Sequence, residues 1–221
     1  LVDQDLDALE TAVKQLTIFD KIIACDVTKK GSAEKVMNSA ILNFGGIDIL
    51  ISNAGNATSG MMLELDDKKL RKAFELNFFA HKSFAVEAAK IMKLQNRGGQ
   101  ILFNISKQAI NPGSNMGAYG LPKATTMFLM RQLALELGSN KIRVNGINAD
   151  RIRSGLLTDN FISERSKSRG ISEQVYMEGN LLKQEVEAKH VAEGFRALAQ
   201  MKRTTGHILT VDGGNTAAEL R

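Results

Sequence analysis

The stretch Ile47-Asp48-Ile49-Leu50-Ile51-Ser52-Asn53-Ala54-Gly55 joins a short apolar run to a turn of small and polar residues. A run of this length that ends in Asn and Gly is typical of a buried strand. Further runs of the same form are predicted to be strands as well. They cover residues 22–25, 100–105, 142–147 and 207–211.

Segments with helical periodicity lie between these predicted strands. They cover residues 5–16, 31–43, 66–94, 117–138 and 187–201. Strands that alternate with helices favour parallel crossovers, so we predict an α/β fold with a doubly wound parallel sheet in three α/β/α layers. No internal repeat or linker interrupts the pattern, and we interpret residues 1–221 as a single domain.

The composition excludes several classes of protein. The 221 residues are 43% hydrophobic and 24% charged, which argues against a disordered or fibrous chain. No apolar run approaches the ~18 residues that cross a bilayer, and the first residues lack the features of a signal peptide. The single cysteine, Cys25, excludes an internal disulfide and fits a reducing compartment. We therefore expect a globular, cytoplasmic protein with no membrane partner.

The net charge of +5 raises the question of nucleic acid. Basic residues are spread along the chain and interleaved with acids, as in residues 64–71, which is typical of a solvated helix face. Tryptophan is absent and there are two tyrosines, so a stacking platform for bases is not expected. We predict no nucleic-acid partner. We also predict no metal site, because His81, His190 and His207 share no ligand spacing.

Polar residues follow the predicted strands directly. In a parallel sheet the carboxyl ends of the strands meet at one edge, where ligands bind. The polar residues that this edge brings together are Asp26, Asn53, Ser106 and the run Asn148–Asp150.

Tyr119 and Lys123 are four positions apart, so both side chains lie on one helix face. Pro122 is acceptable in the first turn of a helix, which predicts a helix start close to Tyr119. A lysine ammonium beside the phenol is expected to lower its pKa from ~10 toward the range of a general base. The hydroxyl of Ser106 could bond the same substrate oxygen. The alternative interpretation is that Tyr119 and Lys123 are ordinary surface residues of the helix.

Together these motifs resemble the short-chain dehydrogenase/reductase family, and the likeness covers nearly the whole chain. The motifs in family order are Cys25-Asp26-Val27, Ser52-Asn53-Ala54-Gly55, Asn77 within Leu76-Asn77-Phe78-Phe79, Ser106, Tyr119-Gly120-Leu121-Pro122-Lys123, Val144-Asn145 and Val211-Asp212-Gly213-Gly214. The resemblance implies a Rossmann-like fold whose first βαβ unit is incomplete.

The resemblance also implies the roles of the catalytic residues. Tyr119 would be the proton donor or acceptor, and Ser106 would orient the substrate carbonyl. Lys123 would tune Tyr119 and hold the nicotinamide ribose. Asn77 would support a water that leads protons to Lys123.

By the same resemblance, an NAD cofactor is implied, with NADP less favoured. Asp3 matches the end of the family's second strand, where a carboxylate accepts hydrogen bonds from ribose hydroxyls and repels a 2′-phosphate. The alternative for Asp3 is a helix N-cap. The other residues implied at the cofactor are Asp26, Val27, Asn53, Ala54, Gly55, Tyr119, Lys123, Ile152 and Ser154.

Two departures from the family pattern stand out. The opening strand and the glycine-rich phosphate turn, roughly thirty to forty residues, have no counterpart, so weaker dinucleotide binding and further sequence upstream are expected. Ala149-Asp150 stands where the family has Pro-Gly. Residues 148–154 and 212–218 more narrowly resemble the dehydrogenase portion of bacterial aldolase–dehydrogenase fusion proteins.

Residues 151–183 are expected to form a mobile flap over the substrate. The basic residues Arg151, Arg153, Arg165, Lys167 and Arg169 could bind a phosphate or carboxylate of the substrate. The alternative, a solvated face on the flap, is the interpretation that we favour at this point.

We therefore expect an NAD-dependent oxidoreductase that acts on a small polyol, sugar or sugar-phosphate-like alcohol. The alternative is a non-catalytic interaction or scaffold domain that keeps the fold. The resemblance also implies a homo-oligomer, a dimer or tetramer, that pairs through the helices at 66–94 and 117–138.

Overall fold

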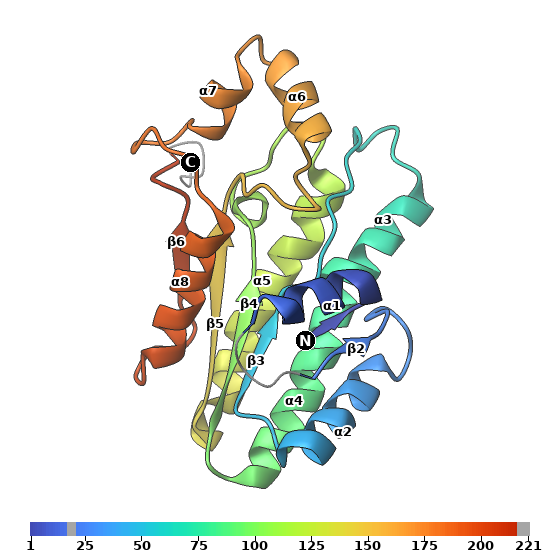
Figure 1. Ribbon diagram of the computed structural model, residues 1–221, viewed down its shortest axis with the longest axis vertical. Coiled ribbons are helices and arrows are strands. Elements are labelled where there is room, and N and C mark those ends of the chain that lie inside the picture. Colours follow the sequence, from blue (N-terminus) through green and yellow to red (C-terminus); the bar gives the residue numbers. More distant parts are fainter. Residues whose placement is uncertain (17–20, 216–221) are drawn as a thin grey trace.

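The computed structural model describes residues 1–16 and 21–215 (Figure 1). The strands are β1 (Val2–Asp3), β2 (Ile23–Ala24), β3 (Ile49–Ser52), β4 (Gly99–Asn104), β5 (Ile142–Ala149) and β6 (Ile208–Val211). The α-helices are α1 (Leu6–Lys14), α2 (Ser32–Phe44), α3 (Asp67–Phe74), α4 (His81–Gln95), α5 (Gly117–Leu137), α6 (Asp159–Lys167), α7 (Glu173–Met177) and α8 (Ala188–Gln200). A π-helix, η1 (Glu75–Ala80), and two 3₁₀ helices, η2 (Lys107–Ala109) and η3 (Gly138–Asn140), complete the order.

The strands form parallel sheets, as the alternation of strands and helices predicts. The described strands divide into a pair, β1-β2, and a four-stranded sheet in the order β3-β4-β5-β6. Their carboxyl ends therefore point to one end of the molecule, which is the end that carries α6 and α7 in Figure 1. The predicted Rossmann-like α/β fold is confirmed, with the strands in two hydrogen-bonded groups.

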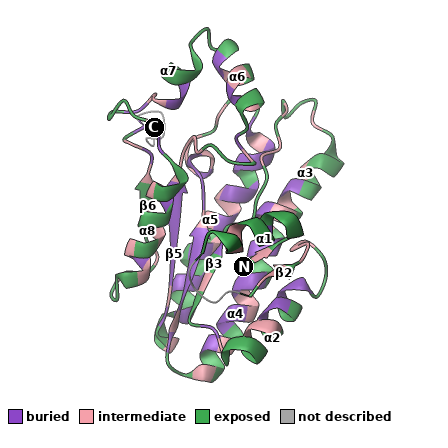
Figure 2. Cartoon of the chain, in the orientation of Figure 1, coloured by how far each residue is buried: buried purple, intermediate pink, exposed green. Residues whose placement is uncertain are grey.

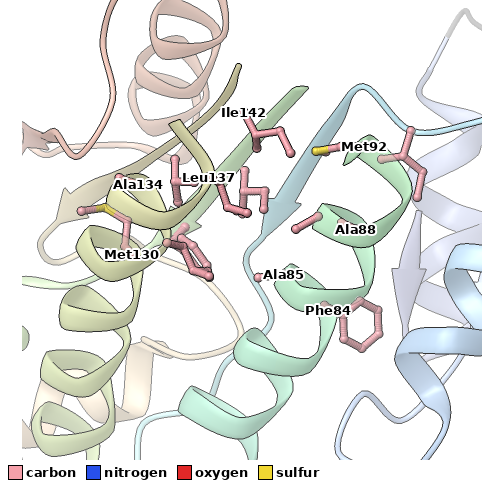
Figure 3. Packing of buried hydrophobic residues seen from close by; sticks show 14 of the residues in the cluster. Phe84, Ala85, Ala88, Met92, Met130, Ala134, Leu137 and Ile142 are labelled. Atoms are coloured by element: carbon pink, nitrogen blue, oxygen red, sulfur yellow. The ribbon is translucent and has the colours of Figure 1, made fainter. Parts of the chain in front are cut away.

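One face of the larger sheet carries the main core. Helices α2, α4 and α5 pack here, and buried residues are concentrated on β4, β5 and the inner sides of α4 and α5 (Figure 2). Met92 of α4 and Met130 of α5 are fully buried in this cluster together with Ile142 of β5 (Figure 3). The periodic apolar positions of these helices are the ones that meet the sheet.

The opposite face is covered by α8 at one side. Successive residues of a strand point to opposite faces, so Leu102 of β4 and Ile147 of β5 pack against Leu198 of α8. Towards the other side, Ile49 and Ile51 of β3 are 47% and 51% exposed. No described helix covers these two isoleucines.

Three local features differ from the sequence predictions. The predicted helix 66–94 is divided into α3, the π-helix η1 and α4. The predicted flap contains two short helices, which begin at the capping residues Thr158 and Ser172. The two-residue strand β1 has too few apolar residues to be predicted from periodicity. Thr216–Ala218, part of the narrower resemblance, lie outside the described residues.

No helix in the described part of the chain is both long and apolar enough to span a membrane.

Candidate active site

Ser106 and Tyr119 meet at the carboxyl end of β4. Ser106 caps η2 and its Oγ accepts the Gln108 amide proton at 3.2 Å. The Ser106 side chain lies close enough to the Tyr119 hydroxyl to lower the pKa of that phenol. Both side chains are buried, and both line a cavity of about 150 Å³. The structure therefore places a serine hydroxyl and a phenol together in a small cavity.

A close approach between α5 and η2 makes this arrangement possible. A Cβ atom on Gly120 would lie 2.8 Å from the backbone oxygen of Gln108, so only glycine allows the two helices to come this near. The helix begins at Gly117, since the Tyr119 and Gly120 amides both donate to Met116 O. Pro122 is therefore the sixth helical residue, and its predicted place in the first turn is wrong by one turn.

Lys123 is fully buried one turn after Tyr119. Its Nζ donates to the backbone oxygen of Asn104 at 2.8 Å and lies 5.8 Å from the centroid of the Tyr119 ring. Burial lowers the pKa of Lys123 to about 8. The ammonium is thus held by the end of β4 on the side of the site that faces the Asn53–Gly55 turn.

The pKa of Tyr119 is raised, which is the opposite of the sequence prediction. Burial of the phenol disfavours its ionised form and is the largest cause. The Ser106 side chain lowers the pKa of Tyr119, and the negative charge of Asp150 raises it. The prediction was wrong because it considered the neighbouring ammonium and neglected burial of the phenol.

Asn77 lies in the π-helix and is fully buried. Its Nδ2 donates to Asn56 O at 2.9 Å and to Ala73 O at 3.1 Å, while its Oδ1 accepts the Asn56 amide proton at 3.3 Å. Its own backbone oxygen accepts a hydrogen bond from Thr126 Oγ1 on α5 at 2.7 Å. Asn77 therefore ties the turn after β3 to the helix that carries Tyr119.

The turn after β3 is narrow where it faces Lys123. A Cβ atom on Gly55 would lie 2.9 Å from Asn77 Oδ1 and 3.6 Å from Lys123 Nζ. Asn53 Oδ1 accepts a hydrogen bond from Asn104 Nδ2 at 2.7 Å. A side chain at position 55 would therefore clash with Asn77, and the backbone of the turn lies close to Asn77 and Lys123.

Two carboxylates stand at the end of the β1-β2 pair. Asp3 ends β1 and is exposed, and its Oδ1 accepts the Asp5 amide proton at 3.0 Å. The N-cap of α1 is Asp5, so the alternative interpretation of Asp3 as a helix cap is wrong. Asp26 follows β2, and hydrogen bonds from Thr28 lower the pKa of Asp26.

The remaining predicted cofactor residues fall into two groups. Ile152 and Ser154 line the same cavity as Tyr119. Val27 packs against the main hydrophobic cluster. The residues at the ends of the first three strands, which do not line that cavity, are Asp3, Asp26, Val27, Asn53, Ala54 and Gly55. The structure therefore spreads the predicted site along the whole carboxyl edge.

An ion-pair group that sequence reasoning missed lies beside Tyr119, with Lys107 buried and Asp150 and Arg151 half-buried. Asp150 is 3.6 Å from Lys107 Nζ and 3.4 Å from Arg151 Nε, and it also accepts a hydrogen bond from Asn215. Burial lowers the pKa of Lys107. The sequence left the effect of Asp150 open, and the structure shows that its charge is matched by two cations. The only sequence signal was the position of Lys107 directly after Ser106.

The histidines have structural contacts. His81 is buried with its Nδ1 2.6 Å from Ser52 Oγ, and His190 Nδ1 accepts the Glu187 amide proton at the start of α8. Across residues 1–16 and 21–215, no group of three His, Cys, Asp or Glu side chains is arranged to hold a metal ion.

Comparison with known proteins places the chain among oxidoreductases. A family model described as enoyl-(acyl carrier protein) reductase matches residues 1–216. The 7alpha-hydroxysteroid dehydrogenase of Escherichia coli is 30% identical over 192 residues, which cover 86% of this chain and 72% of that protein.

Two further similarities differ in how much of the other protein they cover. The uncharacterized oxidoreductase YuxG of Bacillus subtilis is 35% identical over 207 residues; the match covers 90% of this chain but only 30% of YuxG. The L-sorbose reductase of Gluconobacter frateurii, solved as a complex with NADPH and L-sorbose, superposes with a TM-score of 0.86 at 28% identity. That superposition covers 97% of this chain and 85% of the reductase chain.

Proposed function

Because the chain belongs to the short-chain dehydrogenase/reductase family, we propose that it transfers hydride between a nicotinamide cofactor and a small alcohol or carbonyl compound. The substrate class in this proposal is a polyol, a sugar or a sugar-phosphate-like alcohol. The observation that carries the proposal is that Ser106 and Tyr119 line the same small cavity, with Lys123 buried one turn away.

In this proposal Tyr119 is the general acid and base. When bound, the nicotinamide supplies the carbon that accepts or releases the hydride. The raised pKa of Tyr119 keeps the phenol protonated near neutral pH, so it is ready to donate a proton to a carbonyl oxygen in the reductive direction. In the oxidative direction Tyr119 must first lose that proton, which favours alkaline conditions. Ser106 holds the same substrate oxygen by a hydrogen bond.

The residues at the turn after β3 fit a nicotinamide nucleotide. Gly55 leaves the backbone bare beside Asn77 and Lys123, and Lys123 supplies a buried cation for ribose hydroxyls. Asn77 holds the turn in place through Asn56. The water that would lead protons to Lys123 past Asn77 is part of the proposal.

We propose NAD as the preferred nucleotide because Asp3 ends β1 as an exposed carboxylate. A carboxylate there accepts hydrogen bonds from ribose hydroxyls and repels the 2′-phosphate of NADP. A thermal-shift titration tests the preference: NAD should stabilise the wild type more than NADP, and Asp3→Ser should reduce that difference. Stronger stabilisation by NADP in the wild type would reject the assignment.

Substitution of Tyr119 by Phe tests the proposed chemistry. Tyr119→Phe should abolish nearly all turnover of an alcohol panel, because the acid and base is removed while the ring and its packing stay. Urea unfolding and NADH fluorescence titration show whether the variant still folds and still binds nucleotide. An unchanged rate would reject the assignment of Tyr119. A wild-type protein that neither turns over any alcohol nor binds a nicotinamide nucleotide would favour the scaffold alternative.

We also propose that the protein forms a homodimer or tetramer through α4 and α5. Leu121, Phe128 and Leu135 are spaced by seven residues on α5 and are 47%, 68% and 80% exposed. Such a stripe of large apolar side chains is typical of an interaction surface. Phe128→Glu should reduce the sedimentation coefficient of the oligomer. Leu42→Glu on α2, at a residue that is 86% exposed, is the matched control and should leave it unchanged.

A place within a longer cytoplasmic polypeptide, as the dehydrogenase portion of an aldolase–dehydrogenase fusion, completes the proposal. It is supported by the match to YuxG, of which the chain spans 30%. The intact mass of the protein from its native source tests it, because a mass near 24.1 kDa would contradict a fusion.

A further inference from the structure

The cavity that holds Ser106 and Tyr119 has a basic wall supplied by the flap. Arg151 and Arg165 line it, together with Phe161. The Arg165 guanidinium lies over the Phe161 ring, 5.9 Å from its centroid, and Nη1 donates to Ser114 O at 3.0 Å. Arg165 Nε is buried and has no hydrogen-bond partner within the described residues. One donor of a permanent cation is therefore unpaired at a residue that lines this cavity.

The charges around the cavity are unbalanced. Asp150 is the carboxylate among the residues that line it, and Lys107 and Arg151 already pair with Asp150 at 3.6 and 3.4 Å. Within residues 1–16 and 21–215, Arg165 and the neighbouring Arg169 form no ion pair with a carboxylate. Arg169 interacts electrostatically with Arg165, Arg151 and Asp150, which places these groups together.

The arrangement fits an anion better than a neutral polar group. A guanidinium is planar and always charged, and its Nε–H and Nη–H donors match the oxygens of a carboxylate or phosphate. Packing on the Phe161 ring and the bond to Ser114 O hold the Arg165 side chain in one orientation before a ligand arrives. A lysine at this position would lack both the planar fork and the stacking surface.

We propose that the substrate oxidised or reduced at Tyr119 is a short anionic alcohol, a hydroxy acid or a phosphorylated polyol, whose carboxylate or phosphate binds Arg165. This rests on the proposed function. The cavity of about 150 Å³ limits the substrate to a few carbon atoms, because sites for larger ligands enclose several hundred Å³.

The alternative is that Arg165 only ties α6 to the loop before α5 through Ser114. A tie of that kind acts on every substrate equally. An anion-binding residue acts only on substrates that carry the anion, so matched pairs of compounds separate the two roles.

The test compares glycerol with glycerol 3-phosphate, and 1,2-propanediol with lactate, for the wild type and three variants. Arg165→Met removes the guanidinium, and Arg165→Lys keeps the charge without the fork. Arg153→Met is the matched control, because Arg153 is an exposed flap arginine that pairs with Asp159 and Glu185 and does not line the cavity.

We expect the wild type to prefer an anionic member of a pair. Arg165→Met should reduce kcat/KM for that compound by about 10- to 100-fold, mainly through KM, the size expected for loss of a charged hydrogen bond. Its kcat/KM for the neutral member should stay within about twofold, Arg165→Lys should recover part of the loss, and Arg153→Met should match the wild type. A preference for glycerol 3-phosphate identifies a phosphate, and a preference for lactate identifies a carboxylate. Stabilisation by inorganic phosphate or lactate in a thermal-shift assay, lost in Arg165→Met, gives a readout that needs no turnover.

Equal losses on neutral and anionic alcohols would overturn the inference and assign Arg165 to the structural tie. A wild type that prefers the neutral members would overturn it as well while leaving the role of Tyr119 intact. Failure of the proposed function has a different signature: turnover would persist in Tyr119→Phe whichever alcohol is used, or the wild type would turn over no alcohol and bind no nicotinamide nucleotide.

Discussion

Substitution of Gly120 by Ala tests the contact that brings the candidate catalytic groups together. Gly120 follows Tyr119 on α5, and a Cβ atom there would lie 2.8 Å from the backbone oxygen of Gln108 on η2. Ordinary contacts to a Cβ begin near 3.4 Å, so the helix must move by about 0.6 Å. The atom that it meets belongs to the backbone, which cannot turn away as a side chain can.

Two opposing effects set the change in stability. Alanine in place of glycine favours the helix by ~1 kcal/mol, and overpacking costs ~1–3 kcal/mol. We therefore expect the free energy of unfolding to fall by up to ~2 kcal/mol. Turnover should fall as well, because a misplacement of a catalytic group by 1 Å can reduce a rate ~100-fold and the expected movement of α5 is a little over half of 1 Å. We expect kcat to fall about tenfold, since Tyr119 is displaced relative to Ser106.

Urea unfolding and steady-state oxidation of an alcohol measure the two effects in the same preparations. Gly138→Ala is the matched control, because Gly138 has helical backbone angles at the end of α5 and no atom lies within 4 Å of its added Cβ. That control should be as active as the wild type and as stable or slightly more stable. A Gly120→Ala protein that gains stability and keeps full activity would refute the close approach described for α5 and η2.

Three further predictions concern titration, charge and packing. Burial lowers the pKa of Lys123 from 10.5 to about 8, so between these pH values the unfolded chain binds more protons than the folded protein. The free energy of unfolding of the wild type should therefore rise with pH in this window relative to Lys123→Met. Urea unfolding that gives the same pH dependence for both proteins would contradict this. Asp150→Asn should lower the free energy of unfolding by ~3–5 kcal/mol because it leaves Lys107 and Arg151 without their carboxylate. It should also move the pH–rate profile to lower pH, because the Asp150 charge raises the pKa of Tyr119, and an unmoved profile would contradict this electrostatic link. Met130→Ala should lower the free energy of unfolding by ~2–5 kcal/mol because Met130 is fully buried. Leu42→Ala, at an exposed position of α2 outside the proposed subunit interface, should change it by less than ~0.5 kcal/mol, and equal losses in chemical denaturation would reject this description of the core.

Much of the fold could be predicted because its signals are local. The run at 47–51 is short and apolar and ends in Asn and Gly, and the structure places β3 at Ile49–Ser52. The helix predicted at 117–138 is α5, Gly117–Leu137, because its apolar positions meet the sheet in register. The division of the helix predicted at 66–94 was missed, since a π-helical turn changes the backbone bonding without changing the apolar periodicity.

The sequence predicted which residues form the candidate site better than it predicted their hydrogen bonds, ion pairs and pKa shifts. The spacing of Tyr119 and Lys123 shows that they share a helix face, but it cannot show that the ammonium donates to Asn104 O. The direction of the pKa shift of Tyr119 depends on burial, which arises from the flap and from η2. The ion pairs of Asp150 join residues from different loops, so no motif along the chain contains them.

The bare edge of β3 has a consequence for the physical behaviour of the polypeptide in concentrated solution. Ile49 and Ile51 are exposed, and β3 is hydrogen-bonded only to β4 among the described strands. A strand with an unpaired edge offers free backbone groups to a further strand, from another part of the polypeptide or from another copy. Where no further strand covers this edge, lysine at position 49 or 51 should reduce aggregation, measured as turbidity on concentration.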